Sequence, residues 1–408
     1  MCLLRDGREP PATRNEKIAH RMPSTPKNVA ILGSTGSIGR STLDVIAASG
    51  GTLRAAALSA HGSVKRLAAQ AREFGPDRVV ITAPENADNP ALSDLPPETE
   101  LLIGSEYVVK IASHPSIDVV VSAIVGSAGL KGTWAAIEAG KTVALANKES
   151  LVVGGPLVME MATRTGAKLL PVDSEHSAVF QALQAGRQDE VRRVVLTASG
   201  GPFRNHTAEQ LAHVTVEEAL AHPTWNMGPK ITVDSATMMN KALEIIEARW
   251  LFGLSPDQIG VMIHPQSVVH SMVEYIDGSV VAQLSPPDMK LPIQYALTWP
   301  DRLEGVAAKL NWTESLALEF HPPDFGRFPA LSLGLEVARS GGTAGAVLNG
   351  ANEAAVAAFL ERQIRFDQIV PACRDILHNH HFLSDPNLDQ LHSMDLWARE
   401  EITRWIHS

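Results

Sequence analysis

The stretch Asn28-Val-Ala-Ile-Leu-Gly-Ser-Thr-Gly-Ser-Ile-Gly39 decides the fold of this chain. Its apolar first half, 28–32, predicts a short buried strand, and the segment 40–49 that follows predicts a helix. Gly33, Gly36 and Gly39 therefore fall where a strand turns into a helix, with the spacing G-x-x-G-x-x-G. Glycines let the backbone approach a pyrophosphate, and the helix N-terminus offers it free N–H groups. The turn predicts a dinucleotide site; the alternative is a tight turn that binds no ligand.

Apolar runs of strand length recur after this turn, and most are separated by segments of helix length. They are 53–59, 78–82, 119–124, 142–146 and 168–172. Near-continuous apolar runs are typical of parallel strands that are covered on both faces. Residues 27–172 are therefore predicted to form a Rossmann-like dinucleotide-binding domain of the α/β class.

The alternation of strand-length and helix-length segments ends after about residue 175. A strand candidate at 194–197, a proline-broken stretch and a strongly periodic helix at 237–251 are followed by a hairpin signal, Asp277-Gly278. Residues 173–300 are predicted to form a central α+β catalytic domain and residues 301–329 a connector. Ala/Leu/Val periodicity predicts a C-terminal α-helical bundle at 330–408.

Composition narrows the class of protein. A chain of 408 residues exceeds one ordinary core, so two or three domains are expected. The net charge of −10, without a long basic run, argues against a nucleic-acid binder. No apolar stretch approaches the roughly 18–20 residues that span a bilayer, so no membrane partner is expected. Cys2 and Cys373 are too far apart in sequence to suggest a disulfide framework.

The first 26 residues are polar, contain four prolines and lack the apolar core of a secretory signal. We expect residues 1–26 to form a disordered extension, with Met22 as an alternative start, and we expect a cytoplasmic location.

The segment after the second predicted strand favours NADP over NAD. The segment His61-Gly62-Ser63 is followed by Lys65 and Arg66, and no carboxylate is present to accept the ribose 2′-hydroxyl of NAD. Several donors there suit a 2′-phosphate instead. The alternative places Lys65 and Arg66 on a solvated helix face.

Asn147-Lys148-Glu149 follows the strand predicted at 142–146. Ligands of open α/β sheets bind beyond the carboxyl ends of the strands, where this tripeptide falls. The alternative is an ordinary Lys–Glu pair on the surface.

Asp173 and Glu175 come just beyond the last strand of the predicted Rossmann-like domain. If the backbone stays extended there, side chains two residues apart point the same way. Two carboxylates facing one cavity suit Mg²⁺ or Mn²⁺. The alternative is a helix N-terminus, with Asp173 or Ser174 as the cap and Glu175 in the first turn.

The periodic helix at 237–251 would present Asn240, Lys241 and Glu244 on one face. Glu244 could complete a site with three carboxylates, while Asn240 and Lys241 hold an anion or a hydroxyl. The alternative is a solvated stripe with a Lys–Glu pair.

Two further segments suggest substrate contacts. Ser199-Gly200-Gly201-Pro202 follows a strand and resembles turns that hold phosphates. Trp225, on a proline-interrupted loop, suggests a lid that excludes water, although it could equally fill a core.

Six motifs, taken in order, resemble the 1-deoxy-D-xylulose 5-phosphate reductoisomerase family, and the likeness runs from about Lys27 to the C-terminus. They are Gly33-Ser-Thr-Gly-Ser-Ile-Gly39, Ala146-Asn-Lys-Glu-Ser150, Val172-Asp-Ser-Glu-His176, Ala198-Ser-Gly-Gly-Pro-Phe203, His222-Pro-Thr-Trp225 and Val233-Asp-Ser-Ala-Thr-Met-Met-Asn-Lys241.

The resemblance implies a homodimer that converts 1-deoxy-D-xylulose 5-phosphate to 2-C-methyl-D-erythritol 4-phosphate in isoprenoid biosynthesis. The implied cofactors are NADPH and Mn²⁺ or Mg²⁺, with Co²⁺ as a further candidate, and the substrate is a small phosphorylated sugar.

The resemblance also assigns residues to roles. It implies a metal held by Asp173, Glu175 and Glu244, and catalytic residues Lys148, Glu175 and His222. The implied substrate contacts, besides Lys148, are Ser174, Glu175, Ser199, His222, Trp225, Ser235, Asn240, Lys241 and Glu244. The implied nucleotide contacts are Thr35, Gly36, Ser37, Ile38, Asn147, Glu149 and Gly228. To these the sequence pattern itself adds Gly33 of the glycine turn and His61, Gly62 and Ser63 after the second predicted strand.

One departure concerns the 2′-phosphate. Many relatives carry Lys or Arg and Asn where this chain has His61-Gly62-Ser63, so the residues that contact the phosphate stay open. Two other functions also stay open: a metal-independent NADP-dependent dehydrogenase of a small aldehyde or hydroxy acid, and a non-catalytic nucleotide-sensing regulator.

Overall fold

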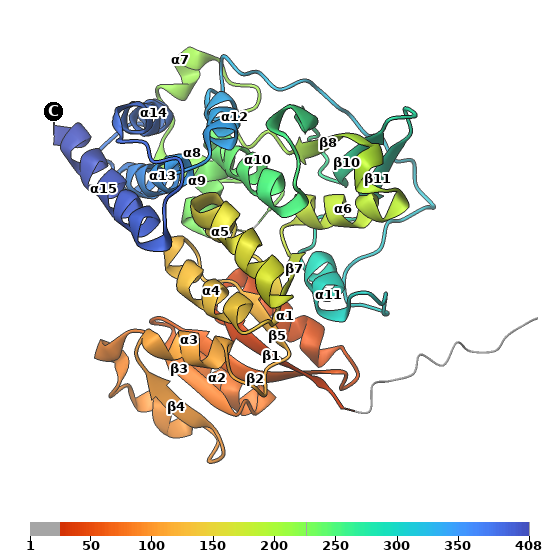
Figure 1. Cartoon of the computed structure of the whole chain (residues 1–408), viewed down its shortest axis with the longest axis vertical. Helices are drawn as coiled ribbons and strands as arrows, with labels where there is room; N and C mark the ends of the chain where they lie inside the picture. The colour runs from red at the N-terminus through yellow and green to blue at the C-terminus, as the bar shows by residue number, and fades with distance from the viewer. Residues whose placement is uncertain (1–24, 226, 408) are drawn as a thin grey trace, which may run out of the picture.

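The computed structural model describes residues 25–225 and 227–407, so the predicted N-terminal extension lies outside the described residues apart from its last two. Seven parallel strands form the first sheet, in the order β4-β3-β2-β1-β5-β6-β7 (Figure 1). The strands are β1 (Lys27–Leu32), β2 (Leu53–Ala60), β3 (Arg78–Ile81), β4 (Glu100–Ile103), β5 (Val119–Ser122), β6 (Thr142–Leu145) and β7 (Lys168–Pro171). The predicted Rossmann-like sheet is present, with β4 as an additional edge strand that the sequence pattern did not reveal.

Helices cover both faces of this sheet: α1 (Ser37–Ala47), α2 (Val64–Phe74), α3 (Glu106–Ala112), α4 (Leu130–Glu138) and α5 (Glu149–Thr165). Successive β1 residues enter different apolar clusters, because side chains alternate across a strand. Val29 and Ile31 belong to one cluster, and Ala30 and Leu32 to the other. Burial on both faces is why the strand sequence is continuously apolar.

The strand order reverses at β1. It pairs with β2 on one side and with β5 on the other, so the segments that leave β1 and β5 meet at the carboxyl edge of the sheet. The glycine turn follows β1 at this point, and the segments that follow β6 and β7 end at the same edge.

A second, mixed sheet has the order β11-β10-β8-β9, with only β8 and β9 parallel. Its strands are β8 (Val191–Ala198), β9 (Ile259–Ile263), β10 (Val269–Tyr275) and β11 (Val280–Leu284). The predicted hairpin at Asp277-Gly278 joins β10 to β11, and Gly278 adopts a φ of 86°, as such a turn requires. Helix α6 (Ser174–Ala182) packs on β10 and β11.

The remaining α-helices either follow strands of this sheet or form the C-terminal bundle. They are α7 (Ala208–Leu211), α8 (Val216–Ala219), α9 (Pro229–Thr237), α10 (Met239–Phe252), α11 (Lys290–Thr298), α12 (Ala330–Ser340), α13 (Ala344–Leu360), α14 (Ile369–Asn379) and α15 (Leu388–His407). The bundle consists of α12 to α15. Helix α13 packs against α14 and α15 and also against α5, so the bundle lies directly on the nucleotide-domain helices (Figure 1).

Candidate active site

Of the three glycines in the turn, only the middle one is not required by packing. A Cβ at Gly33 would lie 2.8 Å from the carbonyl oxygen of Ala123, and one at Gly39 would lie 2.4 Å from that of Gly33. Packing alone therefore requires these two glycines. A Cβ at Gly36 would make only an ordinary 3.4 Å contact, and Gly36 caps α1 without a side-chain hydrogen bond. The α1 N-terminus, at Thr35 to Ile38, is consequently open to an anionic ligand.

The segment after β2 lies beside this turn. The Arg66 guanidinium donates a 3.2 Å hydrogen bond to the carbonyl of Thr35. His61 Nδ1 lies 2.9 Å from the hydroxyl of Thr82. A surface cavity of about 390 Å³ is lined by Gly62, Ser63, Val64, Lys65, Arg66 and Asn89. Four residues predicted to favour NADP, which are Gly62, Ser63, Lys65 and Arg66, thus line one hollow next to the glycine turn, and His61 is not among its lining residues.

Asn147 fixes the segments that follow β5 and β6. Its buried amide donates to the carbonyls of Ile124 (2.7 Å) and Gly126 (2.9 Å) and to Glu149 Oε2 (2.9 Å). These contacts place Asn147 and Glu149 at the carboxyl edge of the first sheet, as expected.

A cluster of carboxylates and lysines lies at the same edge. Lys148 Nζ is 2.7 Å from Asp173 Oδ2 and 3.2 Å from Glu244 Oε1. It also donates to Asn240 Oδ1 at 2.8 Å. Lys241 Nζ is 2.9 Å from Glu175 Oε1 and bonds Glu244 Oε2 as well. Two ammonium groups therefore hold three carboxylates together in a buried site.

The backbone after β7 does not stay extended, so the expectation that strand geometry points Asp173 and Glu175 the same way is wrong. Asp173 is the N-cap of α6, and its Oδ1 accepts the N–H of Glu175 at 3.2 Å. The helix-cap alternative is correct locally, but it does not exclude a site, because Asp173 Oδ2 remains directed at Lys148.

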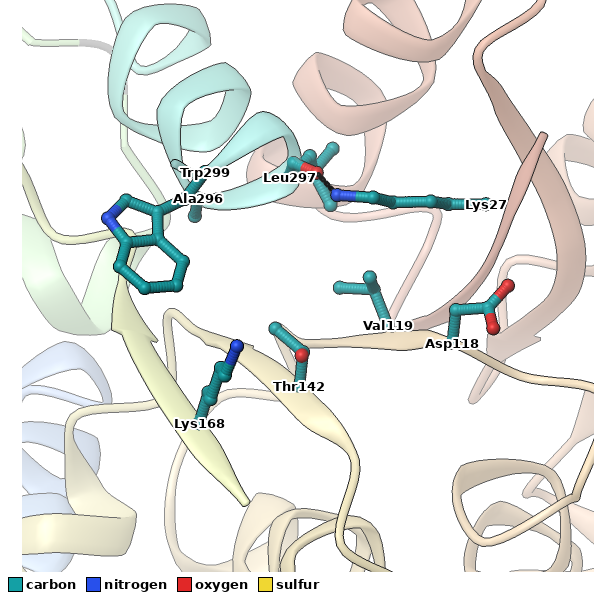
Figure 2. Close-up of a pocket in the computed structure, with 8 residues that line it drawn as sticks. All are labelled: Lys27, Asp118, Val119, Thr142, Lys168, Ala296, Leu297 and Trp299. Carbon is teal, nitrogen blue, oxygen red and sulfur yellow. Dashed lines mark hydrogen bonds between the residues drawn. The ribbon is translucent and has the colours of Figure 1, made fainter. Parts of the chain in front are cut away.

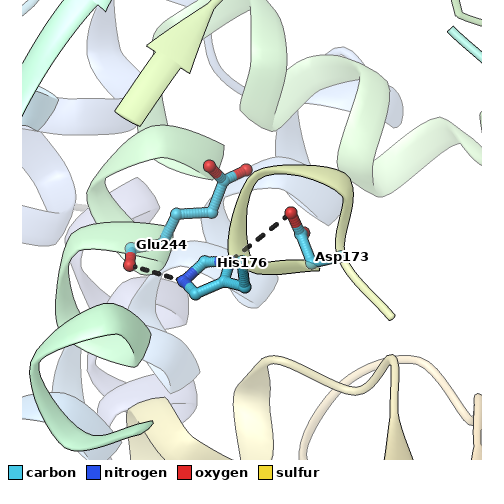
Figure 3. Close-up of side chains that lie close together, drawn as sticks. All are labelled: Asp173, His176 and Glu244. Carbon is cyan, nitrogen blue, oxygen red and sulfur yellow. Dashed lines mark hydrogen bonds and ion pairs between the residues drawn. The ribbon is translucent and has the colours of Figure 1, made fainter. Parts of the chain in front are cut away.

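His176 joins this cluster, although the sequence pattern did not single it out. Ligand atoms of Asp173, His176 and Glu244 all lie within 4.8 Å of one another (Figure 3). His176 Nε2 is 3.0 Å from the carbonyl of Glu244 and 3.6 Å from Glu247 Oε2. The available signal was its spacing, since a residue three positions after a cap lies on the same side of the helix. Glu175 reaches the group through Lys241.

Lys148 and Asp173 stabilise each other's charge, whereas the charge of Glu244 is disfavoured. Burial lowers the pKa of Lys148, but Asp173 and Glu244 more than offset it, and the pKa lies well above its ordinary value. Burial raises the pKa of Asp173, yet the ammonium of Lys148 brings it well below the usual range. For Glu244, burial and the charge of Glu175 raise the pKa despite both lysines. The carboxylate set fits a hard divalent cation, because its donors are oxygens already held in one place.

Two of the predicted substrate residues outside this cluster, Ser199 and His222, contact each other. His222 Nδ1 accepts the N–H groups of Thr224 and Trp225, so its Nε2 carries the proton and donates to Ser199 Oγ at 3.2 Å. Burial lowers the pKa of His222. The Trp225 ring lies 6.3 Å from that of His270. Ser235 lies inside α9, two residues before that helix ends.

A separate cavity of about 220 Å³ lies at the opposite, amino-terminal edge of the first sheet (Figure 2). It is lined where β1, β5, β6 and β7 begin, by residues that include Lys27, Val119, Thr142 and Lys168. It has no part in the site described above.

A nucleotide turn beside a buried carboxylate–lysine cluster defines a nucleotide-linked oxidoreductase with an acidic cation site. Models of one protein family match three successive parts of this sequence. The model described as 1-deoxy-D-xylulose 5-phosphate reductoisomerase matches residues 29–155, the C-terminal domain model of the same enzyme matches 169–252, and the DXP reductoisomerase C-terminal domain model matches 284–401. The chain belongs to the 1-deoxy-D-xylulose 5-phosphate reductoisomerase family.

Relatives of that name support this over nearly the whole chain. The one from Pelodictyon phaeoclathratiforme is 50% identical over 380 residues, covering 93% of this chain and 100% of the relative. The one from Pseudomonas aeruginosa is 48% identical over 392 residues, covering 94% of this chain and 98% of the relative.

Solved structures show the same fold. The Zymomonas mobilis enzyme in complex with NADPH is 44% identical, with a TM-score of 0.87 over 94% of this chain and 100% of that chain. A DOX-P reductoisomerase in complex with NADPH, fosmidomycin and magnesium is 42% identical, with a TM-score of 0.88 over 93% of this chain and 98% of that chain.

The predicted fold class and enzyme class are therefore confirmed. Among the helices that the structure describes, none combines the length and the apolar character needed to cross a membrane.

Proposed function

We propose that this protein converts 1-deoxy-D-xylulose 5-phosphate to 2-C-methyl-D-erythritol 4-phosphate with NADPH and Mg²⁺ or Mn²⁺. The cofactors held by solved relatives, NADPH and magnesium, support it. The observation that carries the proposal is the carboxylate–lysine cluster, which lies at the carboxyl edge of the first sheet, where Asn147 and Glu149 follow β6.

We assign the cation to Asp173, Glu175 and Glu244, with His176 as a neighbouring donor. Bound there, the cation supplies Lewis acidity to substrate oxygens, and NADPH at the glycine turn supplies hydride. Lys148 and Glu175 lie where they can hold or move a hydroxyl proton of the substrate.

The phosphate of the substrate is assigned to the group around Ser199. His222 and Ser199 present an N–H and a hydroxyl there, and Ser199 Oγ accepts the N–H of Gly201 at 3.2 Å. Ser174, Trp225, Ser235, Asn240 and Lys241 are assigned to the substrate as well. Binding a remote phosphate positions the reacting carbons, which favours the chemical step.

The test is NADPH oxidation with 1-deoxy-D-xylulose 5-phosphate and Mn²⁺, before and after treatment with EDTA. We expect turnover that disappears on chelation and returns when Mg²⁺ or Mn²⁺ is added, because the cation is a required Lewis acid. Activity that survives chelation would identify the metal-independent dehydrogenase, and an absence of turnover under all conditions would favour the regulator.

The cavity beside the glycine turn suits the 2′-phosphate of NADPH. We assign the phosphate to Lys65, to the N–H groups at the start of α2 and to Asn89, since these line the cavity where the family's usual residues are replaced. Lys65→Ala is expected to raise the KM for NADPH about tenfold, while the KM for NADH stays nearly constant, because one charge-assisted contact is lost. Steady-state kinetics with both nucleotides check this; equal changes for the two would remove Lys65 from the phosphate site.

We also propose a cytoplasmic homodimer with the domain boundaries expected from the sequence. β11 is an edge strand of the second sheet, Ile276 and Val280 beside its hairpin are 69% and 54% exposed, and Trp312 in the connector is 78% exposed. Exposed apolar groups on a sheet edge favour association with a second copy. Sedimentation equilibrium should give twice the chain mass of 43.8 kDa; a monomer at micromolar concentration would contradict the proposal.

A further inference from the structure

Lys230 is a partly buried cation between two carboxylates that belong to different parts of the fold. It lies in the first turn of α9, two residues after Gly228, which caps that helix. Its Nζ is 2.7 Å from Asp234 Oδ2 and 3.4 Å from Glu149 Oε1. The Asp234 and Glu149 side chains are only 1% and 8% exposed, so the ion pairs are shielded from water.

Both oxygens of Glu149 are occupied by this arrangement. Lys230 holds Oε1, and the amide of Asn147 donates to Oε2 at 2.9 Å. The same amide holds the carbonyls of Ile124 and Gly126, which follow β5. A single ammonium group thus connects α9 to the two nucleotide-domain segments at the carboxyl edge of the sheet.

We propose that Lys230 is a positioning residue for the nicotinamide nucleotide, because it fixes the spacing between Asn147 and Glu149 on one side and Gly228 on the other. This inference rests on the proposed function and on the nucleotide contacts that the family resemblance implies for those three residues. Lys230 itself touches neither the substrate nor the metal ligands, and its role is exerted through Glu149.

The position of Lys230 is itself supported from the C-terminal bundle. Asp234 Oδ1 accepts a 2.9 Å hydrogen bond from the amide of Asn352 on α13, the helix beside α9 (Figure 1). Burial lowers the pKa of Lys230, but Asp234 and Glu149 outweigh burial and the pKa lies above its ordinary value, so the group stays charged. A carboxylate whose orientation is already fixed accepts ligand hydroxyls at a lower entropic cost.

The experiment measures the Kd of NADPH directly by calorimetric titration of the full chain. Lys230→Met is expected to raise Kd about tenfold, since one charge-assisted hydrogen bond that orients Glu149 is lost. Lys230→Arg should return Kd to within about threefold of the unchanged protein, because its guanidinium can bridge both carboxylates. Lys230→Gln serves where the Met variant fails to fold; it keeps a donor without the charge and should also raise Kd.

Lys141→Met is the matched control, because it removes a partly buried lysine whose Nζ donates to the carbonyl of Ile117 at 2.7 Å, at the opposite edge of the first sheet, and leaves the contacts of Lys230 in place. It should change Kd less than about twofold, as expected for a group that does not face the nucleotide segments. In the double variant Lys230→Met/Glu149→Gln, Kd should match that of the more affected single variant.

Three results would overturn the inference. They are an unchanged Kd in folded Lys230 variants, an equal rise in Lys141→Met, and additive effects in the double variant. Failure of the unchanged protein to bind NADPH would overturn the proposed function instead, and the inference with it.

Discussion

Glu244→Gln is expected to remove nearly all turnover while leaving the fold intact. The side chain is 1% exposed and lies between Lys148 and Lys241, where it joins the carboxylate of Asp173 to that of Glu175. The substitution keeps the shape but removes a charged cation ligand. A Lewis acid is worth several kcal/mol at the transition state, so kcat should fall roughly 10³-fold.

Metal affinity should fall together with turnover. Even outer-shell changes cost about 10–100-fold in metal affinity, so loss of a direct ligand should raise the Kd for Mn²⁺ roughly a hundredfold or more. Stability of the metal-free protein should change little, because the raised pKa of Glu244 shows that folding already disfavours its charged form. Mn²⁺ titration followed by electron paramagnetic resonance and thermal unfolding measure the two effects.

Glu274→Gln is the matched control for this variant. Glu274 is also a largely buried carboxylate held by two cations, Arg192 and Arg193, but it lies on β10 of the second sheet. We expect its turnover to stay within about twofold of the unchanged protein, as for a site remote from the chemistry. Normal Mn²⁺ affinity in Glu244→Gln would remove Glu244 from the ligand set.

The elements that could be predicted from the sequence are those determined by residues close together in the chain. The run at 28–32 is apolar because β1 is buried on both faces. Gly33 and Gly39 follow it because a Cβ at either position would collide with a backbone carbonyl, that of Ala123 or that of Gly33. The hairpin at Asp277-Gly278 could also be predicted from the sequence, because the turn residues alone indicate it. β4 was not predicted: its apolar run is only three residues long, Leu101 to Ile103, in a four-residue edge strand with no fully buried position.

The site itself depends on contacts between distant parts of the chain. Lys148 and Asn240 are 92 residues apart in sequence, and no pattern around either one predicts their 2.8 Å contact. Local reasoning also set the two interpretations of Asp173 against each other, as a helix cap or as part of an acidic cluster. The structure shows that one carboxylate does both, because its two oxygens face different partners.

Lys148→Met is expected to shift metal affinity in the opposite direction from Glu244→Gln. Lys148 neutralises Asp173 and Glu244 at 2.7 and 3.2 Å, so its removal makes the cluster more negative. The Kd for Mn²⁺ should fall about threefold to tenfold, since an opposing charge next to the ligands is gone. Turnover should nevertheless fall roughly 10²- to 10³-fold, because the group that holds Asn240 and the substrate hydroxyl is lost.

The unfolding free energy of Lys148→Met should also depend on the metal more strongly than that of the unchanged protein. The metal-free protein should lose about 3–5 kcal/mol of unfolding free energy, because two buried carboxylates lose their cation. Saturating Mn²⁺ should recover most of that loss, so the metal-induced rise in Tm should exceed that of the unchanged protein. Lys290→Met, which removes a pair with Asp44 between α11 and α1, is the control and should show neither effect. Weaker Mn²⁺ binding in Lys148→Met would mean that the lysine supports the ligands rather than opposing the cation.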